Sequence, residues 1–155
     1  DRVGIDATRL NARLLISALG GTAFPDVPPT VDDALAAARS HPIVVMGGTV
    51  PGQTTDTVSA ELAEMGGAEE LMILTNVNGV YTADPRRDPG AERLERITTS
   101  QLVDIVSGGP YKAGSTAIVD PVAAGIIHRG RITTKVLDGR DLDQVSAALA
   151  GGDFD

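Results

Sequence analysis

Apolar residues recur every three or four positions in six separate stretches of the chain, which is the spacing of helices with one apolar face. The first stretch covers residues 1–21, where Leu10, Leu14 and Leu19 follow this spacing and Gly20 ends it. The other five predicted helices cover residues 31–40, 55–67, 98–109, 120–130 and 140–152.

Four shorter apolar runs alternate with these helices and predict strands, at residues 23–27, 42–46, 70–75 and 132–139. The runs PIVVM (42–46) and ELMILT (70–75) are largely apolar over the length of a strand, so we expect both faces of these two strands to be covered. Strands that alternate with helices predict an α/β fold with a parallel sheet and helices on both faces. No repeat or linker interrupts the pattern, so residues 1–155 are expected to form a single domain.

Composition and charge narrow the classes of function. Of the 155 residues 42 % are apolar, which is enough to bury a core. The net charge of −8 argues against a surface that neutralises nucleic acid or anionic lipid, so we expect neither partner. With no cysteine and only His41 and His128 as histidines, no thiolate or histidine-rich metal site is expected. No run reaches the ~18 to 20 apolar residues that span a bilayer, and a cytoplasmic location is predicted.

Arginine is favoured over lysine, and aspartate over glutamate. The chain has eleven arginines and two lysines, and fifteen aspartates against six glutamates. With 3 % aromatic residues, this composition resembles that of proteins from salt-loving organisms, while a GC-rich genome would also favour arginine and alanine. Both hypotheses remain open on the sequence.

The first candidate site is the loop GGTVPGQTT, which follows the predicted strand 42–46. Ligands of open α/β sheets bind beyond the carboxyl ends of the strands. Gly47, Gly48 and Gly52 would let the backbone approach a ligand, and threonine hydroxyls with the N–H groups of the next helix would hold a phosphate. The lysine of a P-loop is absent. A tight strand-to-helix turn capped by Thr55 or Asp56 is the alternative interpretation.

Two further segments carry candidate chemistry. The loop TNVNGVYTADPRRDP follows the predicted strand 70–75 and places Tyr81 beside polar groups, where its ring could stack on a nucleobase. An ordinary long surface loop is the alternative, although such loops are uncommon in compact domains unless they are functional. Residues 108–121 contain Lys112, which could meet a phosphate, and Asp120, which could position a metal or a backbone amide, or cap a helix.

In this order and spacing, GGTVPGQTTDTVSAELAE (47–64), TNVNGVYTADPRRDP (75–89) and KAGSTAIVDPVAAGII (112–127) resemble the archaeal uridylate kinases of the amino acid kinase family. The likeness begins at Asp1 and runs to about residue 150. It implies a three-layer α/β/α sandwich with a mainly parallel central sheet. It also implies transfer of the γ-phosphoryl group of MgATP to UMP, which gives UDP for pyrimidine nucleotide synthesis, and assembly into a homohexamer.

The resemblance also implies roles for individual residues. The UMP site would be lined by Asp1, Thr49, Val50, Pro51, Gly52, Gln53, Thr54 and Thr55. The ATP site would include Thr75, Asn76, Tyr81 and Asp84, with Mg²⁺ accompanying ATP. Asp120 lies in the segment that approaches the transferring phosphates, which makes it the candidate catalytic or organising residue.

Two features depart from the family pattern. Asn78 stands where relatives usually have aspartate, so the part of that aspartate in orienting cationic groups or magnesium is not carried over. The family also begins with a strand that carries a Gly-Gly-Ser phosphate loop, and this sequence does not contain it. We therefore interpret the chain as an N-terminally incomplete domain that is not expected to turn over substrate alone.

Two other functions stay open on the sequence. One is transfer to a different acceptor within the same family, such as acetylglutamate, aspartate, a carbamate or isopentenyl phosphate. The other is a catalytically silent nucleotide-binding or regulatory module, which Asn78 would fit. The loop 49–55 and Asp1 favour the nucleotide acceptor.

Overall fold

The computed structural model describes residues 1–82, 88–108 and 119–152 of the chain. Its elements are α1 (Arg2–Leu19), η1 (Gly20–Thr22), α2 (Val31–Ala38), α3 (Thr55–Gly66), β1 (Leu71–Thr75), β2 (Val80–Tyr81), β3 (Arg93–Leu94), α4 (Thr99–Val106), α5 (Pro121–Gly130), β4 (Thr134–Asp138) and α6 (Leu142–Leu149). All six predicted helices are confirmed, and so are the strands predicted at 70–75 and 132–139. None of the helices in the described ranges has the length and apolar character needed to cross a membrane.

Local sequence explains where the helices begin and end. The Thr98 side chain accepts a hydrogen bond from the backbone N–H of Gln101, and the Gln101 side chain bonds back to the Thr98 backbone, which is a capping box at the start of α4. Pro121 occupies the first turn of α5, where its missing N–H costs nothing. At the end of α3, Gly67 has a φ of +62°, a left-handed conformation that glycine adopts without steric penalty.

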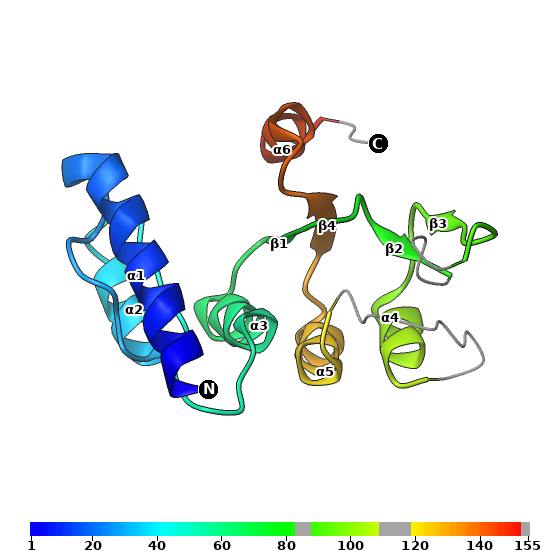
Figure 1. Cartoon of the computed structure of the whole chain (residues 1–155), viewed down its shortest axis with the longest axis horizontal. Coiled ribbons are helices and arrows are strands. Elements are labelled where there is room, and N and C mark those ends of the chain that lie inside the picture. The colour runs from blue at the N-terminus through cyan, green and yellow to red at the C-terminus, as the bar shows by residue number, and fades with distance from the viewer. Residues whose placement is uncertain (83–87, 109–118, 153–155) are drawn as a thin grey trace.

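The strands β1 and β4 pair in parallel, with Leu71 opposite Thr134 and Thr75 opposite Asp138. The helices α3 and α5 cover one face of this pair, and α6 lies on the other face (Figure 1). The described residues therefore form helix, sheet and helix layers, as the alternating pattern predicts. Within the described residues, β1 and β4 form a two-stranded parallel sheet. The strands β2 and β3 form a separate antiparallel pair.

The larger core cluster lies beneath β1, where α3, α4 and α5 meet. Ala123, Ala124 and Ile127 of α5 are fully buried in it, as is Val119 just before this helix. A smaller cluster joins Ala12 and Ile16 of α1 to Val27. Because α5 contributes buried residues on two sides, its position is strongly fixed by packing.

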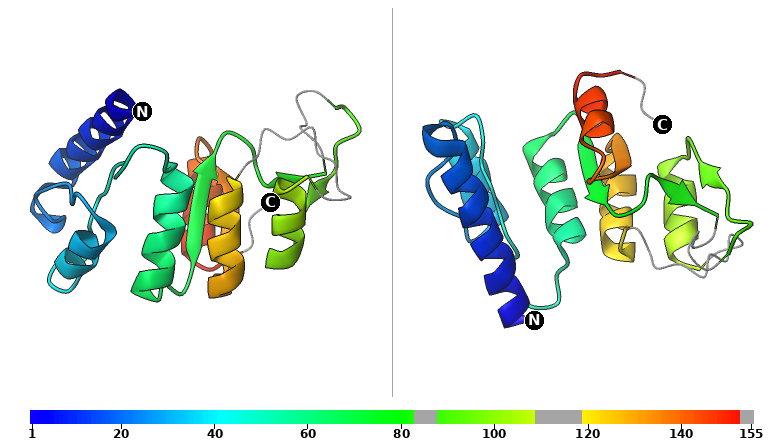
Figure 2. Two further views of the ribbon diagram at one scale, coloured as in Figure 1. Left: turned by 90° about the horizontal axis from the view of Figure 1, so that it is seen from below. Right: turned by 45° about the horizontal axis from the view of Figure 1, so that its top comes forward.

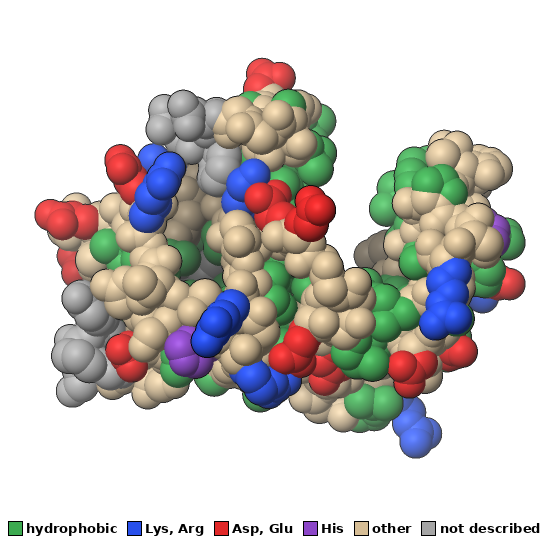
Figure 3. All heavy atoms as spheres, turned by 180° about the vertical axis from the view of Figure 1, so that it is seen from behind, with side chains coloured by type: hydrophobic (Ala, Val, Ile, Leu, Met, Phe, Trp, Pro, Cys, Tyr) green, Lys and Arg blue, Asp and Glu red, His purple; other side chains and the backbone are tan. Residues whose placement is uncertain are grey.

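The helix α1 exposes most of the apolar residues that predicted it. Only Ala12 and Ile16 are buried, whereas Val3, Leu10 and Leu14 are 82 %, 60 % and 63 % exposed. A notch separates the α1–α2 unit from α6, with apolar side chains at its base (Figure 3). The apolar spacing in residues 1–21 thus predicts the helix correctly. The apolar face that it predicts is largely exposed in the described part of the chain.

The strands predicted at 23–27 and 42–46 are wrong as regular strands. The two segments meet only through one parallel bridge between Ala23 and Ile43, in which the Phe24 N–H donates to the Ile43 carbonyl over 2.8 Å. No second backbone hydrogen bond joins these two described segments, so the bridge does not extend into a ladder. Without a ladder, 42–46 is also not covered on both faces: Pro42 is exposed and residues 43–46 are half-buried.

Two more details differ from the sequence prediction. The strand β1 buries Leu71 and Ile73 towards the helices, while Leu74 is 51 % exposed, so only one face is well covered. The loop predicted after β1 contains the short strand β2, which pairs antiparallel with β3 further along the chain, so that Val80 lies opposite Leu94 and Tyr81 opposite Arg93. Two-residue strands leave too little periodicity to be recognised in a sequence.

Candidate functional site

The N-termini of α3 and α5 lie at the carboxyl edge of the parallel pair. Each helix precedes a strand of this pair and runs antiparallel to it, so each helix begins where the strands end (Figure 2). The loop 47–54 leads into α3 at this edge, and Asp120 begins α5 there. The structure thus gathers the first loop and Asp120 where ligands of α/β sheets bind.

Asp120 joins the two helix starts. Its Oδ1 accepts hydrogen bonds from the backbone N–H groups of Val122 and Ala123, at 2.8 and 3.0 Å, so it caps α5. Its Oδ2 accepts from the hydroxyl of Thr54 at 2.5 Å and from that of Thr57 at 3.0 Å. Thr54 is itself the N-cap of α3, because its hydroxyl accepts from the Thr57 N–H at 3.0 Å. The cap predicted at Thr55 or Asp56 therefore lies one residue earlier.

The two carboxyl groups at this junction have opposite pKa shifts. Burial would raise the pKa of Asp120, but hydrogen bonds from Thr54, Ala123, Thr57 and Val122 outweigh it and hold that pKa below its ordinary value. Burial, followed by the nearby charge of Asp120, raises the pKa of Asp56, although the Asp120 backbone N–H donates to it. Asp120 is therefore the more acidic of these two carboxyl groups.

The two glycines at the start of the loop pack against α1. A Cβ on Gly47 would lie 2.8 Å from the backbone nitrogen of Arg9, and one on Gly48 would lie 3.2 Å from the Thr8 hydroxyl oxygen. Such contacts leave no room for a side chain at Gly47. At Gly47 and Gly48 the Cβ side is thus occupied by α1, whereas at Gly52 it is open, and close approach of a ligand to this loop stays a prediction.

The middle of the loop is exposed. Thr49 donates its hydroxyl to the Gln53 side-chain oxygen at 2.6 Å, and the Gln53 amide donates to Glu61 at 2.7 Å. Between them Val50, Pro51 and Gly52 face solvent, and Gly52 has a φ of +90° that only glycine adopts readily. Thr55, the first residue of α3, is exposed and has no side-chain hydrogen bond to a described residue.

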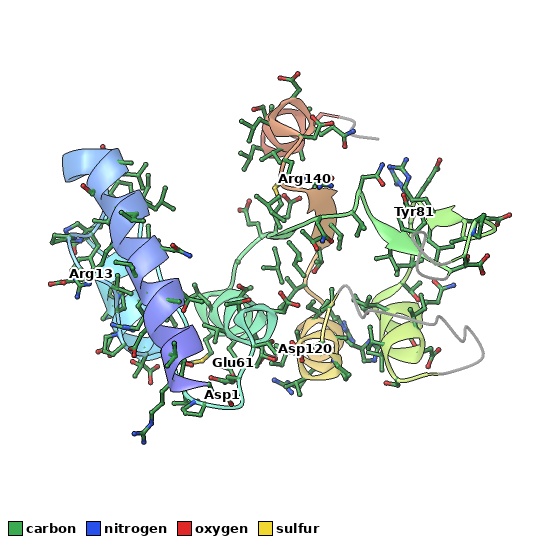
Figure 4. All side chains as sticks on the ribbon, viewed as in Figure 1. Asp1, Arg13, Glu61, Tyr81, Asp120 and Arg140 are labelled. Carbon is green, nitrogen blue, oxygen red and sulfur yellow. The ribbon has the colours of Figure 1, made fainter. Side chains whose placement is uncertain are left out.

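Asp1 lies beside this loop. It is the N-cap position of α1, its side chain makes no capping hydrogen bond, and it is exposed. Figures 1 and 2 both place the start of α1 next to the loop that enters α3. The structure therefore brings Asp1, the loop 49–55 and Asp120 to one side of the molecule, as Figure 4 shows for Asp1 and Asp120.

The second candidate group lies at the ends of β1 and β4. The Gly139 N–H donates to the Thr75 carbonyl at 2.9 Å, and the Arg140 guanidinium donates to the Asn76 carbonyl at 3.0 Å. Arg140 also forms a 2.5 Å ion pair with Asp138, and its hydrogen bonds lower the pKa of Asp138 to about 2. The turn after β4 thus holds the backbone of Thr75 and Asn76.

Tyr81 is held by Asn78. Its hydroxyl donates to the Asn78 side-chain oxygen at 2.5 Å, and both residues are half-buried. Asn78, which stands where relatives usually have aspartate, therefore binds the Tyr81 hydroxyl. Asp84 and Lys112 lie outside the described residues. Figure 4 shows Tyr81 and Arg140 well apart from Asp1 and Asp120.

An open cavity of about 470 Å³ lies at the start of α6, lined by Asp138, Arg140, Asp141, Leu142 and Asp143. It opens at the same sheet edge as Thr75 and Asn76. Within the ranges that the structure describes, no group of three or more His, Cys, Asp or Glu side chains is placed to hold a metal ion.

The sequence profile of the amino acid kinase family matches residues 1–138. The chain belongs to the amino acid kinase family.

The relatives reported for this member of the family come from two archaea. The chain is 52 % identical to the uridylate kinase of Methanococcoides burtonii over 145 residues, which is 94 % of the chain and 62 % of that protein. It is 49 % identical to the uridylate kinase of Halobacterium salinarum over all 155 residues, or 64 % of that protein. The chain therefore spans somewhat less than two thirds of the length of these relatives.

Solved structures support the same fold. The crystal structure of uridylate kinase from Archaeoglobus fulgidus matches with a TM-score of 0.86 and 42 % identity, over 97 % of this chain and 67 % of that one. The UMP kinase from Ureaplasma parvum matches with a TM-score of 0.77 at 20 % identity, which shows the fold alone. The described parallel pair and its helices are thus part of an amino acid kinase-like α/β fold.

Three residues with contacts at these sites were not predicted from the sequence. Thr57 donates to Asp120, Thr8 accepts from the Gly48 N–H, and Arg140 binds the Asn76 carbonyl. Arg140 follows the end of a predicted strand, so the strand-end rule could have found it. Thr8 and Thr57 lie within helices and give no signal, because their partners are 40 and 63 residues away in the sequence.

Proposed function

We propose that the full-length gene product transfers the γ-phosphoryl group of MgATP to UMP, giving ADP and UDP. The observation that carries this proposal is the loop 49–55, with its exposed middle at Val50, Pro51 and Gly52, which leads into the N-terminus of α3 at the carboxyl edge of the sheet. The archaeal relatives at about half identity are named uridylate kinases. The complete fold would be a three-layer sandwich with a mainly parallel sheet, of which β1, β4 and their helices form one part.

The UMP phosphate would be held without a lysine. The first N–H groups of α3 have no partner within the helix, and the helix dipole places partial positive charge there. Thr55 adds a hydroxyl that is not used by a described residue. Asp1 stands beside the loop, where its carboxylate suits a hydroxyl or N–H donor of the nucleoside. The UMP phosphate is itself the nucleophile, so no general base is required.

ATP would lie along the second group. Thr75, Asn76 and Tyr81 would contact it, together with Asp84 from outside the described residues. Mg²⁺ would come bound to the phosphates of ATP and neutralise their charge. Asp120 does not fit as a direct magnesium ligand, because its two oxygens already accept hydrogen bonds from two hydroxyls and two amides. We therefore assign Asp120 a positioning role, in which it fixes the helix start that faces the UMP phosphate.

A coupled assay tests the function. We expect the full-length gene product to release ADP from MgATP when UMP is present, and not when acetylglutamate, aspartate, carbamate or isopentenyl phosphate replaces it. ADP release with one of these acceptors would show that the protein phosphorylates that acceptor in place of UMP. Binding of UMP or ATP in a thermal-shift measurement, with no ADP from any acceptor, would identify a silent nucleotide-binding module. A Thr54→Ala/Thr55→Ala variant that UMP protects from melting as well as it protects the wild type would also contradict the assigned loop.

The exposed face of α1 fits the homohexamer that the resemblance implies. Val3, Leu10 and Leu14 are more than half exposed on this helix, and Leu15 is also exposed. Apolar side chains gathered along one helix are a common contact between subunits. Light scattering on the full-length product should give a hexamer, and Leu10→Glu/Leu14→Glu should give smaller species. A monomeric wild type would contradict this assembly.

A further inference from the structure

The loop that precedes α3 is attached to α1 by one hydroxyl group. The Gly48 backbone N–H donates to the Thr8 Oγ1 at 2.8 Å, and the Thr8 hydroxyl donates to the Ile5 carbonyl at 2.8 Å. Gly48 is buried and Thr8 is half-buried, so water does not readily replace this contact. The hydroxyl thus joins a helix and a loop that lie 40 residues apart in the sequence.

The loop lies directly on the backbone of α1 at this point. A Cβ on Gly47 would come within 2.8 Å of the Arg9 nitrogen and 2.9 Å of its Cα, and one on Gly48 would come within 3.2 Å of Ile5 Cγ1. These contacts set how closely the loop approaches the helix. The directional hydrogen bond from the Gly48 N–H to Thr8 adds a fixed point along the helix axis.

The Thr8 hydroxyl also contacts the first turn of α1. Thr8 donates to Ile5, and the Ile5 N–H in turn donates to the Asp1 carbonyl at 3.0 Å. Asp1 and the loop 49–55 are the two segments assigned to UMP. One side chain therefore sets their relative position, although it belongs to neither.

The opposite end of the loop is attached separately. There the Thr54 hydroxyl donates to Asp120 at the start of α5. Between the two attachments, Val50, Pro51 and Gly52 are exposed. The loop is thus held at Gly48 by α1 and at Thr54 by α5, with its ligand-facing middle between them.

We infer that Thr8 is a positioning residue for the site of the nucleoside monophosphate. It places the loop 49–55 relative to Asp1 and touches no substrate itself. This inference rests on the proposed function for its substrate, while the attachment of the loop to α1 stands on the contacts alone.

Two substitutions and a control separate this role from a general effect on folding. Thr8→Val keeps the shape of the side chain and removes the hydroxyl, whereas Thr8→Ser keeps the hydroxyl. The control Thr133→Val makes the same change at an exposed position before β4, where the Thr133 side chain has no partner among the described residues. For the full-length product we expect Thr8→Val to raise the KM for UMP about five- to tenfold, the effect of one lost hydrogen bond. The KM for ATP should stay within about twofold, and Thr8→Ser and Thr133→Val should resemble the wild type.

Hydrogen exchange gives a readout that does not need turnover. Thr8→Val should speed exchange of the Gly48 amide at least about fivefold, with amides of α5 unchanged. Unchanged Gly48 exchange would overturn the inference, and so would an equal rise in both KM values. If the wild type ignores UMP but Gly48 exchange rises in Thr8→Val, the proposed function fails and the loop attachment stands.

Discussion

Each threonine near the start of α3 can donate one hydroxyl hydrogen bond, and the structure shows which group accepts it. Thr49 gives its proton to Gln53, and Thr54 and Thr57 give theirs to Asp120. Only Thr55 keeps a donor that no described residue uses. Among these four residues, Thr55 is therefore suited to a phosphate, while Thr54 is suited to holding the loop.

A pair of valine substitutions separates these two roles. Thr55→Val should leave the unfolding temperature unchanged and raise the KM for UMP about five- to tenfold, because one hydrogen bond to the substrate is lost. Thr54→Val should destabilise the protein by about 1 kcal/mol, because it removes the N-cap of α3. Thermal unfolding by circular dichroism and a UMP titration would measure both. A Thr55→Val variant that melts early and binds UMP normally would reverse the assignment.

Asp120→Ala should be more damaging than either valine substitution. It removes the N-cap of α5, which costs about 1 kcal/mol, and it leaves the buried Thr57 hydroxyl without its acceptor, which costs about 1 to 3 kcal/mol more. Urea unfolding at pH 7 would measure the loss. Asp104→Ala, an exposed position in α4, is the matched control.

The effect of Asp120 should depend on pH in a defined direction. Its pKa in the folded protein is lowered, so its stabilising contribution is complete above the ordinary aspartate value of 3.8 and is lost as the pH falls below it. The difference in stability between wild type and Asp120→Ala should therefore shrink from pH 7 to pH 3. Asp56 works in the opposite sense, because its raised pKa penalises the charged form at neutral pH. A difference that grows on acidification would contradict the hydrogen-bond network.

At the scale of elements, the contact between α3 and α5 explains how the two helix starts meet. Both helices bury alanines in the shared cluster, namely Ala60 and Ala63 of α3 and Ala123 and Ala124 of α5. Small side chains let two helices approach closely. Because α3 and α5 are close, the side chain of Thr54 can reach Asp120 without distortion.

Enlarging one alanine tests this packing. Ala123→Leu should cost about 1 to 3 kcal/mol, because a fully buried position has no space for three extra carbons. Val122→Leu is the control on the same helix, since Val122 is 61 % exposed and should change stability little. Chemical denaturation would compare the two variants. Equal stability of Ala123→Leu and wild type would show that the two helices can move apart.

At the scale of the whole molecule, a net charge of −8 on 155 residues makes the folded chain repel itself. Salt should therefore raise the unfolding temperature. Simple screening is nearly complete by about 1 M salt, where the Debye length is about 3 Å. The composition alone does not decide between adaptation to salt and codon usage as the cause of the many arginines and aspartates.

Melting curves in KCl distinguish these explanations. If the protein is adapted to salt, its unfolding temperature should keep rising through molar KCl, and it should unfold when salt is withdrawn. If codon usage explains the arginines, the rise should level off once charge repulsion is screened. A curve that does not respond to KCl at all would contradict both the repulsion and the adaptation.

The sequence by itself determined the helices, the strands at 70–75 and 132–139, their place in a parallel sheet, and the strand end at which Thr75 lies. These features depend on apolar periodicity and on capping residues a few positions apart, so the local sequence contains them. It could not determine the contact of Gly48 with α1, the different roles of Thr54 and Thr55, or the missing ladder along 42–46. Those depend on partners tens of residues away, and only the packing of α1, α3 and α5 brings these partners within hydrogen-bonding distance.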